Sequence, residues 1–134
     1  MGHIQKWLVA SALTLSTAVW AAPVVDLTGT YVDRSTGSEV MLLRQGTVYA
    51  VSLMAKNGQN MGFANGMAGF KDQRARIGVE DYADCHIEVA VKGSGLQLTQ
   101  SSSAMDCGFG NNVFADGVYK KTKSSVNFSR HSME

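Results

Sequence analysis

A period-two alternation of apolar and polar residues constrains this chain most, since it fits half-buried strands and no stretch sustains helical spacing. The clearest alternation covers residues 85–91, where Cys85, Ile87 and Val89 fall on one face of an extended segment. Residues 74–79 repeat the pattern, with two arginines on the face opposite the apolar residues. Both segments are predicted to be β-strands with one buried face.

Turn residues divide the chain into hairpins. Lys92–Gly95 supplies a turn, after which the alternation resumes over residues 96–99. Upstream, Ser38–Arg44 and Thr47–Ala55 are apolar, β-branched or aromatic runs on either side of a Gln-Gly pair, which predicts a second hairpin. Asn57-Gly58 is a strong turn signal, because both residue types tolerate positive φ.

The small residues of the stretch 61–70 allow two interpretations. Asn65-Gly66 lies at its centre, so the stretch is either a hairpin of two short strands or a glycine-rich loop. The whole chain has 14 Gly and 1 Pro, so Gly and Asn supply its turns.

The first and last predicted strands carry the same short pattern, Gly29-Thr-Tyr31 and Gly117-Val-Tyr119. When an antiparallel sheet curls on itself, its terminal strands become neighbours and its open edges disappear. We therefore predict an all-β fold, a small antiparallel barrel or sandwich of about seven to nine strands.

The N-terminal segment is typical of an export signal. A lysine precedes an apolar run from Trp7 to Trp20, and small residues follow it. Cleavage after Ala21 is favoured, because cleavage after Ala22 would place bulky Trp20 where the peptidase needs a small residue. The predicted organisation is a signal peptide over 1–21, a β-barrel-like domain over 22–121 and a flexible C-terminal tail over 122–134. The predicted location is the periplasm or the exterior.

The predicted export also affects how the two cysteines and the net charge are interpreted. In an oxidising compartment, Cys85 and Cys107 favour one disulfide. The chain has 12 basic and 11 acidic residues, and Lys6 is the charged residue that leaves with the signal. A neutral chain argues against nucleic acid as a partner, and against a membrane partner after signal cleavage.

The residues that could serve in catalysis or metal binding are not at the positions that these functions require. His131 lies in the predicted tail, and His86 directly follows Cys85, so those two side chains would point to opposite faces of a strand. An acidic cluster does not have the spacing of a calcium loop and is predicted to be a solvated rim. It comprises Glu80, Asp81, Asp84 and Glu88. We therefore predict no catalytic residue, no metal site and no cofactor.

The loop that begins at Cys107 is the predicted partner-binding site. Its sequence, Cys-Gly-Phe-Gly-Asn-Asn, indicates a tight turn held by the disulfide, and an exposed aromatic on a rigid loop is typical of a binding epitope. The alternative is that the phenylalanine folds inward and caps the core. The predicted contact residues are Phe109, Gly110, Asn111 and Asn112.

Several stretches resemble a known group of proteins. These are Cys85–Val89, Leu96–Gln100, Cys107–Val113 and Asp116–Lys120. They resemble small β-rich domains of the Gram-negative envelope, in which a Cys-Gly-Phe-Gly-x-x-Val segment leads to a final Gly-x-Tyr strand. Some such domains are associated with LprI-type lysozyme-inhibitor proteins. The resemblance implies a small exported β-fold and a role in inhibition.

Two functions therefore fit the sequence. The first is a non-catalytic periplasmic binding protein, an inhibitor or immunity protein whose partner is a cell-wall hydrolase such as a lysozyme or an amidase. The second is a small-ligand carrier with an apolar barrel cavity. Apolar residues at 41–43 and 51–54, with small residues at 62–69, motivate the second hypothesis.

Overall fold

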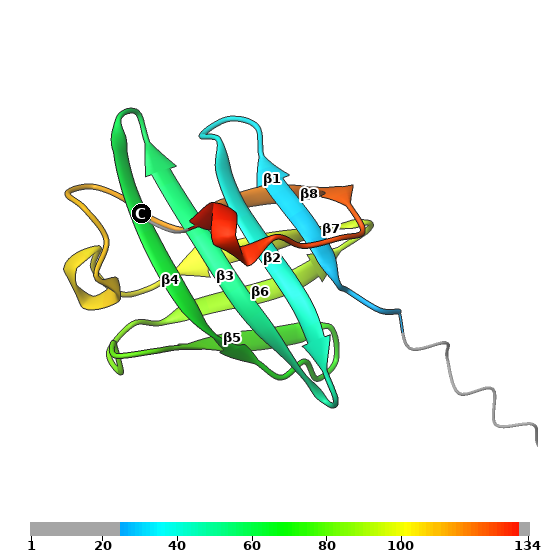
Figure 1. The fold of residues 1–134 in the computed structure, drawn as a ribbon. Helices are drawn as coiled ribbons and strands as arrows, with labels where there is room; N and C mark the ends of the chain where they lie inside the picture. Colours follow the sequence, from blue (N-terminus) through cyan, green and yellow to red (C-terminus); the bar gives the residue numbers. More distant parts are fainter. Residues whose placement is uncertain (1–24, 132–134) are drawn as a thin grey trace, which may run out of the picture.

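The computed structural model describes residues 25–131, and these form a closed antiparallel barrel of eight strands in chain order (Figure 1). The strands are β1 (Gly29–Asp33), β2 (Ser38–Gln45), β3 (Val48–Asn57), β4 (Asn60–Ala68), β5 (Arg74–Val79), β6 (Ile87–Lys92), β7 (Gly95–Gln100) and β8 (Gly117–Lys123). Two short 3₁₀ helices, η1 (Met105–Cys107) and η2 (Phe128–His131), complete the fold. The all-β prediction is confirmed, and the architecture is a barrel. The predicted signal peptide lies outside the described residues.

The predicted hairpins are present with small shifts at their ends. β2 pairs with β3, and β6 pairs with β7, both antiparallel. The turn between β3 and β4 lies one position later than the predicted Asn57-Gly58 pair. Its two central residues are Gly58, at φ 63°, and Gln59, while Asn57 pairs with Asn60 at the end of the ladder. The alternation in β5 holds, since Ala75, Ile77 and Val79 are buried while the arginines beside them are exposed.

Neither interpretation of residues 61–70 was right, because Asn60–Ala68 is one continuous strand. Asn65 pairs with Ser52 in the middle of the β3–β4 ladder, so this Asn-Gly pair does not turn the chain. The small residues serve packing instead. A Cβ atom on Gly66 would collide with the backbone of Gly78 in β5.

The seam between β1 and β8 explains the repeated Gly-x-Tyr pattern. These strands pair antiparallel and close the barrel, as predicted for the terminal strands. Gly29 and Gly117 have φ of 155° and 157°, values that favour glycine. A Cβ atom on Gly29 would lie 2.5 Å from the Lys123 carbonyl oxygen across the seam. Tyr31 and Tyr119 point into the core, which receives side chains from all eight strands.

The two core tyrosines are held in the same way. The Tyr31 hydroxyl donates to the Leu27 carbonyl at 2.7 Å, and the Tyr119 hydroxyl donates to the Ala115 carbonyl at 2.8 Å. Each acceptor lies four residues before its tyrosine. Burial raises the pKa of Tyr31 to about 12, and burial also raises the pKa of Tyr119. Both phenols therefore remain neutral donors well above neutral pH.

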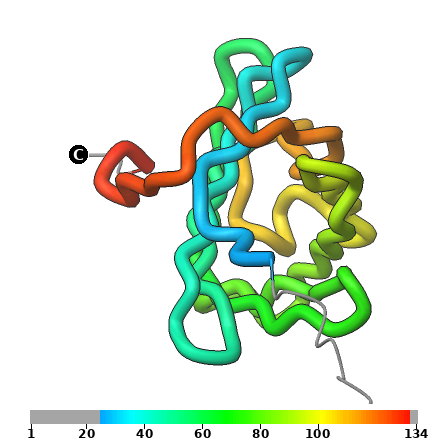
Figure 2. Tube along the Cα trace, turned by 90° about the vertical axis from the view of Figure 1, so that its right-hand side faces the viewer, coloured from blue at the N-terminus to red at the C-terminus, as the bar shows by residue number. Residues whose placement is uncertain are grey.

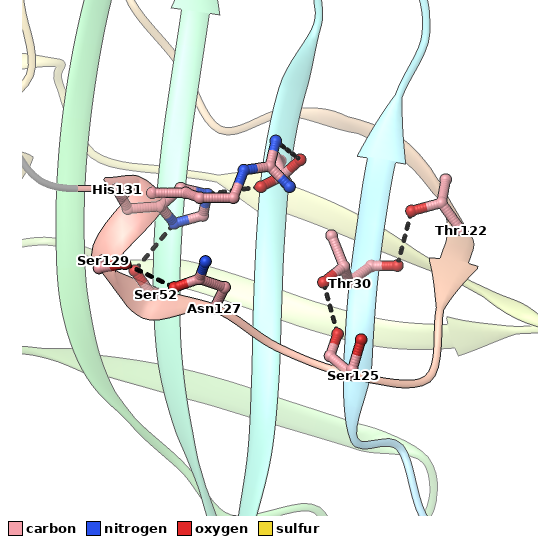
Figure 3. A network of polar contacts seen from close by, with 9 residues as sticks. Thr30, Ser52, Thr122, Ser125, Asn127, Ser129 and His131 are labelled. Atoms are coloured by element: carbon pink, nitrogen blue, oxygen red, sulfur yellow. Dashed lines mark hydrogen bonds and ion pairs between the residues drawn. The ribbon is translucent and has the colours of Figure 1, made fainter.

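The prediction of a flexible C-terminal tail is wrong for residues 122–131. β8 continues to Lys123, and η2 lies outside the barrel wall against β3 (Figures 1 and 2). The connecting segment is tied to β1, where the Thr30 hydroxyl donates to the Ser125 carbonyl at 2.7 Å (Figure 3). Most side chains of this segment are exposed, as its polar character suggested, but Ser125, Arg130 and His131 are hydrogen-bonded to the barrel.

His131 is the centre of a buried polar network on the outer face of β2 and β3 (Figure 3). Its Nδ1 lies 2.8 Å from Ser52 Oγ, and its Nε2 lies 2.9 Å from Glu39 Oε1. Arg130 approaches the other Glu39 oxygen at 3.3 Å. Met41, which pairs with Ser52 in the ladder, is fully buried although it is absent from the core cluster inside the barrel. The C-terminal segment therefore covers an outer face that would otherwise meet solvent.

We expect His131→Ala to lower the free energy of unfolding by about 1–3 kcal/mol, because it leaves the Glu39 carboxylate and the Ser52 hydroxyl buried without this partner. Urea unfolding measures the change. His86→Ala is the control, since the hydrogen bond from His86 to Ser102 is donated by the backbone. Equal stability of the two variants would contradict the proposed role of His131.

In the Tyr31→Phe variant, the free energy of unfolding is expected to fall less steeply with rising alkaline pH than in the wild type. Because the pKa of Tyr31 is raised from 10.0 to about 12 on folding, the unfolded chain releases this proton first. The contribution of Tyr31 is complete below pH 10.0 and is lost as the pH rises toward about 12. Urea unfolding of both proteins across this range should show the steeper decline in the wild type. Parallel curves would contradict the assignment.

Candidate functional site

The loop predicted to bind a partner closes one end of the barrel, beside the β3–β4 turn (Figure 1). The predicted Cys85–Cys107 disulfide is present and joins the loop before β6 to η1, and both cysteines are buried. Gly108 ends η1 in the left-handed region, with φ 71°. We call this end of the molecule the disulfide end, and define it as residues 57–61, 80–86 and 101–116.

Side-chain hydrogen bonds fix the loop on both flanks. From the β3–β4 turn, the Asn57 side-chain amide donates to the Asn112 carbonyl at 2.8 Å. From β7, the Gln100 side-chain oxygen accepts the Ala115 N–H at 2.8 Å. The other end of the Gln100 amide donates to the Ser102 carbonyl at 3.2 Å. With the disulfide, these contacts hold the loop in one conformation before any partner arrives.

The four predicted contact residues differ in position. Phe109 is 3% exposed and belongs to the core, with its ring against Gly62. The inward alternative therefore describes Phe109, and the expectation of an exposed aromatic at this position is wrong. Gly110 is partly buried, while Asn111 and Asn112 are exposed.

Other apolar side chains are exposed at this end. Met105 is 78% exposed, and three more large apolar residues are between 42% and 48% exposed. These three are Met61, Tyr82 and Phe114. The Tyr82 ring lies over Gly108, and the backbone of Met61 lies beside Gly110, so these residues surround the loop. Exposed methionine and aromatic side chains are typical of protein interfaces.

Charge at the disulfide end is mostly negative, although Arg34 in the β1–β2 turn and Lys56 near the end of β3 lie at the same end of the barrel. The two loops 80–86 and 101–116 contain carboxylates and neither Lys nor Arg. The carboxylates are Glu80, Asp81, Asp84, Asp106 and Asp116, and all five residues are exposed. Three residues of the predicted solvated acidic rim, Glu80, Asp81 and Asp84, therefore border the apolar side chains. The fourth, Glu88, lies in β6 beside Arg76. The loop carboxylates and the apolar side chains together form an apolar surface with an acidic edge.

The sequence could not reveal this surface for a physical reason. Three of its four apolar residues stand between strands, where no period of two or 3.6 separates inward from outward positions, and only Met61 lies in a strand, β4. The available signal was the density of carboxylates and apolar residues in segments that lack Lys and Arg, beside two linked cysteines.

The hydrogen bonds run from Ser52 to His131 and on to Glu39, which is the order found in a hydrolytic triad. From the sequence, His131 was predicted to lie in a flexible tail. Ser52 is 2% exposed and lies beneath the C-terminal segment. In this arrangement a substrate cannot reach its hydroxyl. We interpret the network as an attachment for η2.

Residues 25–131 contain neither an arranged metal-binding cluster nor a membrane-spanning helix. In that range, no group of three or more His, Cys, Asp and Glu side chains is arranged to hold a metal ion. None of the helices there has the length and apolar character needed to cross a membrane.

Comparison of the chain with models of protein families, with curated proteins and with solved structures finds no match. Functional inference therefore rests on the geometry and chemistry of the described residues.

Replacing Cys85 or Cys107 by Ser should lower the free energy of unfolding by about 3 kcal/mol in either case, because each change removes the same covalent link. Urea unfolding measures stability, and hydrogen exchange at residues 108–114 should report a looser loop. The double variant is the control and should match both single variants. Clearly unequal single variants would contradict a purely structural role for the bond.

Proposed function

We propose that this protein is a non-catalytic, exported binding protein that inhibits a peptidoglycan-degrading enzyme, either a lysozyme or an amidase. The observation that carries the proposal is the apolar surface with an acidic edge at the disulfide end. Met105 and Phe114 belong to the loop that the disulfide holds, and Tyr82 lies directly over it. The exposed Asn111 and Asn112 remain contact residues in this proposal, and Phe109 supports the loop from below.

Rigidity favours this use of the loop. Binding costs free energy when side chains and loops must be ordered, and a loop already fixed by a disulfide and by Asn57 and Gln100 avoids much of that cost. A few aromatic and methionine anchors can then carry most of the affinity. Such a loop suits insertion into the cleft of an enzyme.

The acidic edge favours a basic partner. An enzyme that degrades an anionic cell wall gains from basic surface near its substrate cleft. Carboxylates around an apolar centre would attract that surface and speed association without needing to be buried. The disulfide and the predicted export signal agree with action in the periplasm, the compartment where such an enzyme meets its substrate.

A small-ligand carrier is the second candidate. The strands that motivated it contribute Leu42, Val51 and Leu53 to the packed core. Phe109 occupies the space over Gly62 that small residues were expected to leave open. Side chains therefore fill the interior positions that motivated this candidate, and a separate cavity lies at the opposite end of the barrel.

Met105→Ala and Phe114→Ala should each weaken inhibition of the target enzyme by about tenfold, since each removes an exposed apolar anchor. The measurement is the inhibition constant against the lysozyme or amidase that the wild-type protein slows in a panel. Met67→Ala is the matched control, because Met67 is 41% exposed on β4, away from the disulfide end.

Two outcomes would contradict the proposal. One is that the wild-type protein neither slows nor co-elutes with any enzyme of the panel. The other is that Met67→Ala weakens inhibition as much as Met105→Ala, because the apolar surface at the disulfide end would then have no special role.

A further inference from the structure

The barrel end opposite the disulfide contains a cavity of about 440 Å³. We call it the open end, and define it by the residues that line the cavity. Its apolar lining comes from Leu27, Tyr31, Phe70 and Val91. Small-molecule sites in proteins are typically about 300–1,000 Å³ and mostly apolar, so the size and the lining are suitable.

The walls of this cavity are fixed. The Leu27 N–H donates to the Tyr49 hydroxyl at 3.0 Å, and the Leu27 carbonyl accepts from the Tyr31 hydroxyl at 2.7 Å. The Tyr49 and Phe70 rings pack edge to face, with centroids 5.5 Å apart. Leu27, Phe70 and Val91 also pack against the core. The site is therefore formed without a ligand.

Lys121 gives the cavity a charged group. Lys121 shares its face of β8 with the inward-facing Tyr119, and its Nζ lies 5.9 Å from the centre of the Tyr31 ring. Among residues 25–131, Lys121 forms no ion pair within 4.0 Å. The Asp26 carboxylate also lines the cavity. The hydrogen bond that its Oδ1 accepts from the Thr28 N–H at 2.9 Å lowers the pKa of this carboxyl, and the charges of Arg44 and Lys121 lower it further.

The surrounding strand ends and turns are rich in cations. They carry Arg44, Lys71, Arg74, Lys92 and Lys123, against the carboxylates of Asp26 and Asp72. This balance is the reverse of that at the disulfide end, and it favours a ligand with negative charge.

We propose that the open end binds a small apolar molecule with a single anionic group, of the class of carboxylate amphiphiles. The apolar part would contact Leu27, Phe70 and Val91, and the anionic group would lie beside Lys121. The site is independent of the proposed inhibitor function, because it uses none of the residues of the disulfide end.

Three ligands with one tail and different head groups test the proposal: decanoate, decanol and decyltrimethylammonium, each below its micelle concentration. Displacement of the neutral probe N-phenyl-1-naphthylamine from the full chain measures their affinities. We expect decanoate to bind about threefold more tightly than decanol, as for a partly exposed charge pair, and the cationic ligand to bind most weakly.

Lys121→Met should remove the preference for decanoate while decanol affinity stays the same. Lys120→Met is the matched control, since Lys120 lies on the opposite face of β8 and should leave the preference unchanged. Decanoate should also shift the amide resonances of residues 93–95 and leave those of 108–112 in place.

The proposal is overturned if the protein binds none of the ligands, if all three bind equally, or if Lys121→Met retains the preference. Shifts confined to residues 108–112 would also overturn it, since the ligand would then occupy the disulfide end. None of these results depends on enzyme inhibition, so this proposal and the inhibitor proposal can fail separately.

Discussion

The pairing of β1 with β8 is the interaction on which the rest of the structure depends. It joins strands from the two ends of the described chain, and it removes the open edges that a curled sheet would leave. Gly29 permits the close approach at this seam, and Tyr31 and Tyr119 fill the core on either side of it. Because the barrel wall is closed, the turns and loops lie at its two ends. Those ends are therefore where binding surfaces and cavities can form.

Much of this fold could be predicted from local pattern, and the exceptions have physical causes. Period-two alternation gave β5 and β7 nearly to the residue, because each has one buried face. Two Asn-Gly pairs behaved differently. Gly58 of the pair at 57–58 lies in the turn after β3, whereas the pair at 65–66 lies inside β4, where the glycine allows β5 to approach. An Asn-Gly pair permits either a turn or a strand, and tertiary packing determines which of the two conformations forms.

The candidate sites were less predictable, because they depend on contacts between distant segments. The sequence indicated the correct loop and disulfide, but Phe109 turns inward to fill the space over Gly62, 47 positions earlier in the chain. His131 is separated by 79 residues from Ser52 and by 92 from Glu39, and no local pattern records such a pairing. Exposed Met105 and Tyr82 belong to loops without periodicity. Their role in a surface emerges when the disulfide brings the loops together.

The formal net charge does not show how charged residues are distributed over the molecule. A net charge of +1 for the whole chain argues against a polyanionic partner, yet the two barrel ends carry opposite charge. The acidic loops around Cys85 and Cys107 suit a basic protein, while Lys121 and the neighbouring cations suit a small anion. The packed core, built from side chains of all eight strands, separates the two ends. We therefore expect occupation of one end to leave binding at the other unchanged, since coupling requires a state that both ligands bias.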